Sequence, residues 1–77
     1  MTFTETQIPG LVLVDMERIE DGRGFFARAW SSREFADHGV TSDFPETNFS
    51  ASNRKGTIRG LHYQKAPHQE AKFVRCI

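Results

Sequence analysis

The sequence predicts an all-β fold with one short helix. Its 77 residues are enough for one small domain, and a hydrophobic share of 38% is typical of a chain that folds. Glycine, proline and asparagine interrupt the chain so often that the segments between them suit strands better than long helices. We expect strands over residues 10–14, 24–30, 47–52, 57–64 and 71–77.

The one predicted helix lies near residues 31–38. Ser31 followed by Glu34 has the spacing of a capping box, which satisfies free backbone N–H groups at the start of a helix. Trp30 and Phe35 stand where a hydrophobic staple would clamp the same end. Gly39 supplies the stop, because glycine adopts the left-handed backbone that ends many helices.

Charge and composition exclude several classes of protein. Ten basic residues balance ten acidic ones, so the chain lacks the basic excess of a general binder of nucleic acid or membrane surfaces. The longest apolar run, residues 11–14, is far below the about 20 residues that span a bilayer. The single Cys76 leaves no internal disulfide. With no signal-like start, we expect a cytoplasmic protein without nucleic-acid or membrane partners.

The chain ends on a strand-like segment, residues 72–77, with no turn signal after it. An apolar final strand needs neighbours on its edges. Either it closes a very small sheet or it belongs to a longer protein, and we expect the longer protein.

The densest polar cluster is residues 59–64, followed by His68, Glu70 and Lys72. Strict strand alternation would place Arg59 and His62 on opposite faces. A bulge at a glycine can re-aim one side chain. We therefore predict that Arg59 and His62 face the same cavity through an irregularity at Gly60.

Simpler interpretations of this cluster stay open. His62 could be a hydrogen-bonded structural residue, and Arg59 and Lys72 could be solvated surface charges. His62, His68 and Glu70 could hold a metal ion, but the close histidine pair of metal-binding barrels is absent, so we expect no metal. Spacing alone indicates a small β domain that binds a sugar or an anion.

The chain resembles the dTDP-4-dehydrorhamnose 3,5-epimerase family from about Thr6 to Ile77. The runs Arg-Gly-Phe-Phe at 23–26 and Arg-Gly-Leu-His-Tyr-Gln at 59–64 are together highly specific. The other matching stretches are residues 8–10, 21–22, 33–35, 56–58, 67–68 and 72–75. The resemblance implies that residues 1–77 are the N-terminal part of a single cupin-type (jelly-roll) β-barrel domain. It also implies a homodimer with exchanged N-terminal strands.

The resemblance further implies an isomerase that epimerises the carbons beside the ketone of a dTDP-4-keto-6-deoxyhexose, as in dTDP-rhamnose or related deoxysugar biosynthesis. The substrate partner is a dTDP-sugar, and no cofactor is required. The implied catalytic residues are His62, as the base, and Lys72, beside the ketone. The implied substrate-binding residues are Arg23, Phe26, Arg28, Glu46, Asn48, Arg59 and His68. Arg28 and Glu46 depart from the glutamate and glutamine that many members carry, which affects nucleotide or sugar preference more than the reaction.

Such a reaction removes a proton from one face of a carbon and returns one to the other face. A histidine titrates near neutral pH and suits the base, while a lysine can stabilise the enolate oxygen. In the family, a Tyr and an Asp from the later half supply the second proton and orient the histidine. We therefore expect the 77-residue chain alone to be inactive. The alternative is a catalytically silent truncated cupin fragment that binds sugar nucleotide or only dimerises.

Overall fold

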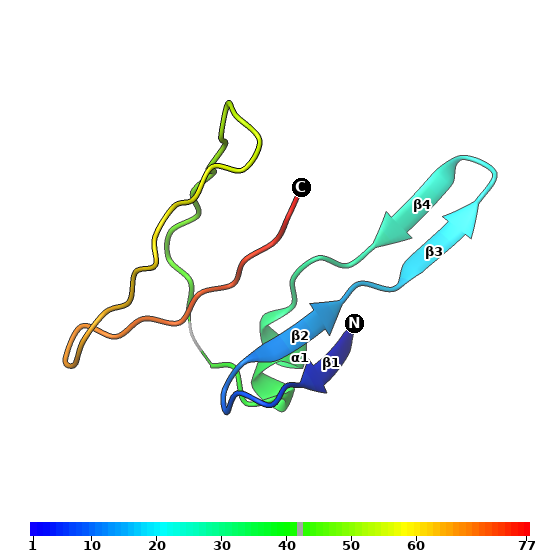
Figure 1. The fold of residues 1–77 in the computed structure, drawn as a ribbon. Helices are drawn as coiled ribbons and strands as arrows, with labels where there is room; N and C mark the ends of the chain where they lie inside the picture. Colours follow the sequence, from blue (N-terminus) through cyan, green and yellow to red (C-terminus); the bar gives the residue numbers. More distant parts are fainter. Residues whose placement is uncertain (42) are drawn as a thin grey trace. The chain divides into compact units, whose positions relative to one another are not determined.

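The computed structural model describes residues 1–41 and 43–77. The chain divides into two compact units, the first Met1–Thr41 and the second the remainder to Ile77. In the described residues, every strand and helix belongs to the first unit, in the order β1, β2, β3, β4 and α1 (Figure 1).

The first hairpin pairs β1 (Thr2–Glu5) with β2 (Val12–Asp15) in antiparallel register, with Phe3 opposite Val14. These two side chains are half-buried while their chain neighbours are exposed, as the two-residue period of a strand requires. Thr6 closes the connecting loop, because its backbone N–H and its hydroxyl both donate to the carbonyl oxygen of Leu11, at 3.2 and 2.8 Å.

The second hairpin pairs β3 (Arg18–Asp21) with β4 (Gly24–Ala27). Asp21 lies opposite Gly24, so only two residues form the turn. The Arg18 guanidinium lies over the Phe25 ring, 4.4 Å from its centre, in a cation–π contact across the strands. The side chains of β3 are exposed throughout, so strand pairing holds this hairpin more than burial does.

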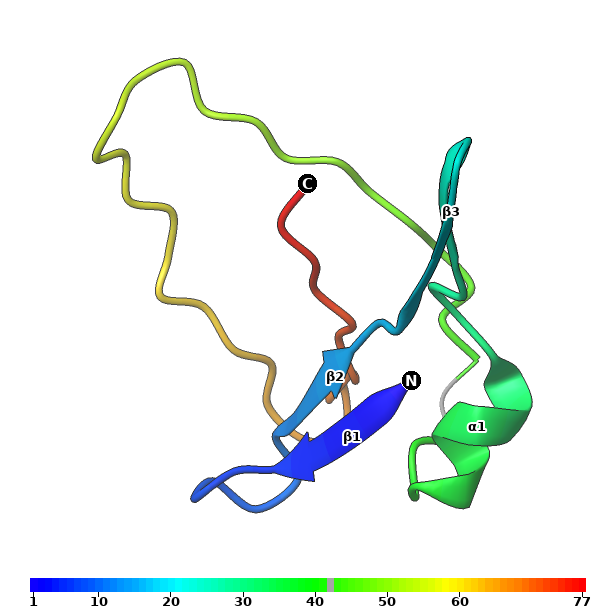
Figure 2. The same cartoon turned by 90° about the vertical axis from the view of Figure 1, so that its right-hand side faces the viewer.

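Helix α1 (Ser32–Asp37) begins as predicted (Figure 2). The Ser31 hydroxyl oxygen accepts a hydrogen bond from the Glu34 backbone N–H at 3.2 Å. The ring centres of Trp30 and Phe35 lie 4.2 Å apart, which forms the staple. Capping box spacing therefore identified the start of the helix correctly.

The helix also ends where predicted. Gly39 has a φ of +82°, and its N–H donates to the carbonyl oxygen of Ala36 at 3.0 Å. The N–H of Val40 donates to the carbonyl oxygen of Phe35 at 2.8 Å. These two bonds form a Schellman motif, which satisfies carbonyl groups that the helix itself leaves free.

Phe35 forms the core of the first unit. It is 2% exposed and is the one fully buried side chain among the described residues. The Phe3 ring meets it edge-on at 5.1 Å between centres and also stacks on the His38 ring at 3.9 Å. Helix α1 therefore packs on β1 through aromatic contacts.

The second unit contains neither helix nor strand over its described residues, 43–77 (Figure 1). Its Phe44 and Phe73 rings lie 6.3 Å apart between centres. A turn forms where the His68 N–H donates to the carbonyl oxygen of Lys65 at 2.8 Å. Every described side chain after Phe44 is exposed, so this unit has no buried core of its own in the part described.

The predicted fold class is confirmed only in its coarse form, strands with one short helix. The predicted strands at 10–14 and 24–30 correspond to β2 and the shorter β4, and β1 and β3 were not predicted. The predicted strands at 47–52, 57–64 and 71–77 are wrong for this structure, and the described residues form two hairpins instead of a barrel. A strand needs a partner for its backbone N–H and C=O groups, and these segments meet none within residues 43–77.

A membrane span was not expected, and among the described residues no helix has the length and apolar character to cross a membrane.

Replacing the helix cap is expected to unravel α1. Ser31→Ala removes the acceptor for the Glu34 N–H, and loss of such a cap costs about 1 kcal/mol. Cα chemical shifts of residues 32–37 measure the helix population. Ser32→Ala is the matched control, since it changes the neighbouring serine inside the helix and should preserve the population. Equal helix populations in both variants would contradict the capping role.

The isolated 77-residue chain is expected to self-associate. Ile58, Leu61 and Val74 are 82% exposed or more, and strand-forming segments without partners favour pairing between chains. Sedimentation velocity should show oligomers that grow with concentration. A monomer that melts cooperatively in calorimetry would contradict this expectation.

Candidate functional site

The residues that the sequence singles out fall on both units. Those of the first unit lie on or just after the β3–β4 hairpin: Arg23, Phe26 and Arg28. Those of the second unit are Glu46, Asn48, Arg59, His62, His68 and Lys72, all exposed.

Arg23 is held by Asp21 across the β3–β4 turn. Its backbone N–H donates to Asp21 Oδ1 at 2.8 Å, and its Nη2 and Nε donate to Asp21 Oδ2 at 2.7 and 3.2 Å. The side-chain hydrogen bonds from Arg23 hold the pKa of the Asp21 carboxyl below its ordinary value of 3.8, and the backbone bond adds to this. The same contact raises the pKa of Arg23. Both groups therefore stay charged at neutral pH, with the guanidinium fixed at the turn.

Phe26 lies in β4, and Arg28 directly follows this strand on the chain that leads to α1. Arg28 Nη1 lies 3.4 Å from Glu34 Oε2, so an acidic side chain of the helix partly balances the positive charge of Arg28. The Phe26 side chain is 67% exposed and presents an open aromatic face.

Arg59 is anchored to a segment seven to eight residues before it. Its Nε donates to Ser52 Oγ at 3.0 Å, and its Nη2 donates to the carbonyl oxygen of Ala51 at 2.6 Å. The guanidinium thus ties the stretch around residue 59 to that around residue 52, without a strand ladder between them.

Gly60 brings the backbone close to the His62 ring. Its φ is +108°, a conformation that residues with a Cβ rarely adopt. A Cβ placed at Gly60 would come within 3.1 Å of His62 Nδ1. That Arg59 and His62 face the same cavity through an irregularity at Gly60 stays a prediction.

Lys72 lies in a small polar network. Its Nζ is 3.3 Å from Glu70 Oε1. Oriented with its nitrogen toward these acceptors, the Gln64 amide can donate to the Glu70 carboxylate, whose oxygens lie 3.2 Å away, and to the carbonyl oxygen of His68 at 3.0 Å. One carboxylate therefore receives an ammonium and an amide from two points of the chain.

The side chains that the sequence offered as metal ligands do not form a metal site in this structure. Among residues 1–41 and 43–77, no three His, Cys, Asp or Glu side chains gather closely enough to hold a metal ion. This applies to the trio His62, His68 and Glu70.

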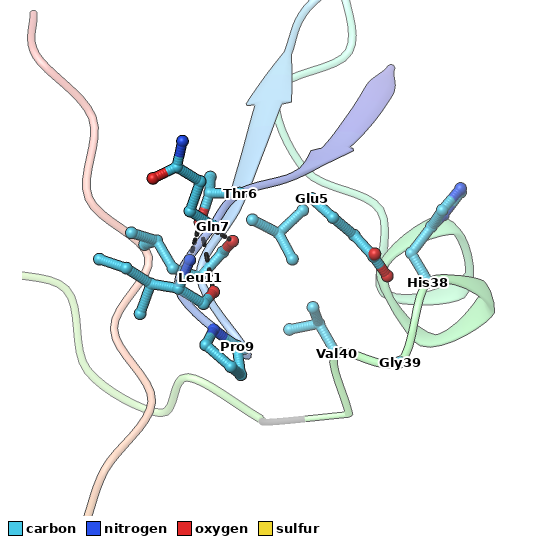
Figure 3. A pocket seen from close by; sticks show the side chains of 11 residues that line it. Glu5, Thr6, Gln7, Pro9, Leu11, His38, Gly39 and Val40 are labelled. Atoms are coloured by element: carbon cyan, nitrogen blue, oxygen red, sulfur yellow. Dashed lines mark hydrogen bonds between the residues drawn. The ribbon is translucent and has the colours of Figure 1, made fainter.

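A hollow of about 500 Å³ lies in the first unit, between the β1–β2 loop and the end of α1 (Figure 3). Its lining includes Glu5, Leu11, His38 and Val40. The residues that the sequence predicts for the site are absent from this lining, so the hollow is separate from the predicted chemistry.

Sequence reasoning missed the partners of two predicted cations. Asp21 pairs with Arg23 and Glu70 with Lys72, in both cases across a spacing of two residues. Opposite charges at i and i+2 were therefore a usable signal of these pairs. The approach of Gln64 to Glu70 depends on the turn between them, so the spacing of the two residues does not predict it.

Comparison with known proteins places the chain among sugar-nucleotide isomerases. Residues 5–77 match the family described as dTDP-4-dehydrorhamnose 3,5-epimerase. The chain therefore belongs to the dTDP-4-dehydrorhamnose 3,5-epimerase family, as the resemblance predicted.

Curated relatives carry the same description. The chain is 36% identical to the dTDP-4-dehydrorhamnose 3,5-epimerase of Shigella flexneri, over 100% of this chain and 42% of that protein. It is 35% identical to that of Sinorhizobium fredii over 99% and 39%, and 38% identical to that of Pseudomonas aeruginosa over 97% and 41%. The chain thus spans about two-fifths of the length of these relatives. No solved structure gives a significant match.

A methyl group at Gly60 is expected to displace the His62 ring. Gly60→Ala imposes both a strained φ and a contact tighter than Cβ atoms normally make. The His62 ring resonances in ¹H–¹³C spectra should shift. Gly56→Ala is the matched control, because Gly56 has a φ of +79° but open space around its Cβ position. Unchanged His62 resonances in Gly60→Ala would contradict the close approach.

Proposed function

We propose that the protein, as part of a complete family domain, epimerises the carbons beside the ketone of a dTDP-4-keto-6-deoxyhexose. The match to the family over residues 5–77 carries this proposal. It is supported by the residues themselves, since a histidine, a lysine and two arginines suit the proton transfer, the enolate and the diphosphate of such a substrate.

In the proposed reaction, His62 removes the proton from a carbon next to the ketone. The electron pair left behind moves into an enolate, and its negative charge develops on the ketone oxygen. Lys72 donates to that oxygen as a compact positive charge, which lowers the barrier because the contact strengthens as the charge forms. A proton returned to the opposite face of the carbon completes the inversion.

Arg23 and Arg59 serve the diphosphate in this proposal. A guanidinium offers a planar fork of donors that matches phosphate oxygens. Each is already oriented by contacts with its own neighbours, Arg23 by Asp21 and Arg59 by Ser52 and Ala51. Phe26, Arg28, Glu46, Asn48 and His68 complete the proposed lining of the site.

The complete domain is proposed to be a cupin-type barrel in a cytoplasmic homodimer that exchanges N-terminal strands. The segments at 57–64 and 71–77 lie between turn residues as short strands do, yet they pair with nothing in the part of the chain described, which supports partners elsewhere. A Tyr and an Asp from outside these residues would supply the second proton and orient His62.

A second function is proposed for the 77 residues in isolation: a catalytically silent fragment that binds sugar nucleotide or only dimerises. Among the described residues only one side chain, Phe35, is buried, and so small a core favours a fragment without catalytic activity. A site open to solvent loses the low-dielectric surroundings on which enolate stabilisation depends.

Deuterium wash-in separates the roles of His62 and Lys72. In protein expressed from the full reading frame, His62→Ala should abolish exchange of the sugar ring protons of dTDP-4-keto-6-deoxyglucose with solvent deuterium. Lys72→Ala should slow exchange about 10²–10³-fold, the usual effect of losing one such donor. Both variants should bind dTDP as the wild type does, since neither touches Arg23 or Arg59. NMR follows the exchange and calorimetry the binding.

Lys65→Ala is the control for Lys72, because it removes a nearby lysine that has no proposed role. Near-normal wash-in by His62→Ala would remove that residue as the base. A wild-type protein without any wash-in would overturn the proposed reaction altogether.

A further inference from the structure

The proposed catalytic lysine is linked to the strand-like run that carries the proposed base. Lys72 Nζ lies 3.3 Å from Glu70 Oε1, and the amide of Gln64, two residues after His62, lies within 3.2 Å of the same carboxylate and can donate to it when its nitrogen faces Glu70. The Glu70 carboxylate therefore bridges the end of the run 59–64 and Lys72.

The turn between them brings these groups together. The His68 N–H donates to the carbonyl oxygen of Lys65 at 2.8 Å, and the Gln64 amide, in the same orientation, can donate to the carbonyl oxygen of His68 at 3.0 Å. The chain thus reverses over residues 65–68, and Glu70 and Lys72 follow on the segment after the turn.

We infer that Glu70 is a positioning residue that holds the Lys72 ammonium at a fixed place relative to His62, with Gln64 orienting the Glu70 carboxylate. This inference rests on the proposed function. A base and an enolate-stabilising donor must reach the same substrate at once, and a flexible lysine side chain has four rotatable bonds that must be ordered. A carboxylate held by a second donor supplies that order.

Stability alone does not explain the network. Glu70 and Lys72 are 48% and 61% exposed, and solvent screens such pairs so strongly that they contribute little to folding. A positioning role therefore differs from a structural one in a single property: Glu70 changes the reaction rate only while Lys72 is present.

The test is a double-mutant cycle in the protein expressed from its full reading frame. Glu70→Ala should lower kcat for wash-in about 10- to 100-fold, as expected for a misplaced catalytic group, without raising KM. Lys72→Ala combined with Glu70→Ala should be no slower than Lys72→Ala alone, because the two residues act through one contact. Glu70→Gln should recover part of the rate, since its carbonyl oxygen can still accept from the ammonium. Gln69→Ala, at the adjacent position, should behave as wild type.

Two outcomes would overturn the inference while leaving the proposed function intact. One is a wild-type rate in Glu70→Ala. The other is that Glu70→Ala lowers the rate of the Lys72→Ala variant by the same factor as it lowers the rate of the wild type. Absence of wash-in by the wild type would instead overturn the proposed function.

A second measurement does not depend on activity. In protein labelled with ¹³C at glutamate, Lys72→Ala should move the Glu70 Cδ resonance and Lys65→Ala should not. An unmoved resonance in Lys72→Ala would show that the contact is absent and would also overturn the inference.

Discussion

Strand pairing is the interaction on which the rest of this structure depends. Each extended residue presents a backbone N–H and C=O that need partners, and a neighbouring strand is the usual source. In the first unit, two short turns return the chain on itself, so β1 meets β2 and β3 meets β4. After Phe44 the described chain finds no such partner, and it keeps its local geometry only through turns and side-chain contacts.

This constraint also shapes the candidate site. In the second unit, Arg59 and Lys72 are placed by hydrogen bonds and an ion pair, with no sheet beneath them. Such contacts orient the two side chains but contribute little to the free energy of folding in water. The chain can therefore belong to an enzyme family although its candidate site residues are exposed. The chemistry proposed for the family requires a closed site, and closing one takes strands that cover these side chains.

The sequence predicted best what depends on near neighbours. The start and end of α1 follow from Ser31, Trp30 and Gly39, whose roles involve residues within five positions. The strand β3 escaped prediction because Arg18–Asp21 is mostly charged and becomes a strand only by pairing with β4. The later strands were predicted because glycine, proline and asparagine divide the chain into short segments, but such punctuation says nothing about whether a partner strand is present. For the site, residue types could be predicted through the family resemblance, whereas the Gln64–Glu70–Lys72 contacts depend on a turn that spacing does not reveal.

Hydrogen exchange tests most directly the claim that strand partners for the second unit come from outside these 77 residues. Amide exchange would be compared between the 77-residue chain and the protein expressed from its full reading frame, with residues 57–64 and 71–77 as reporters. The account predicts rapid exchange in the 77-residue chain when it is diluted until it is monomeric, and strong protection of alternate amides in the full protein. The amides of α1 should be protected in both and serve as the internal reference. Equally rapid exchange of residues 57–64 and 71–77 in both proteins would contradict the account.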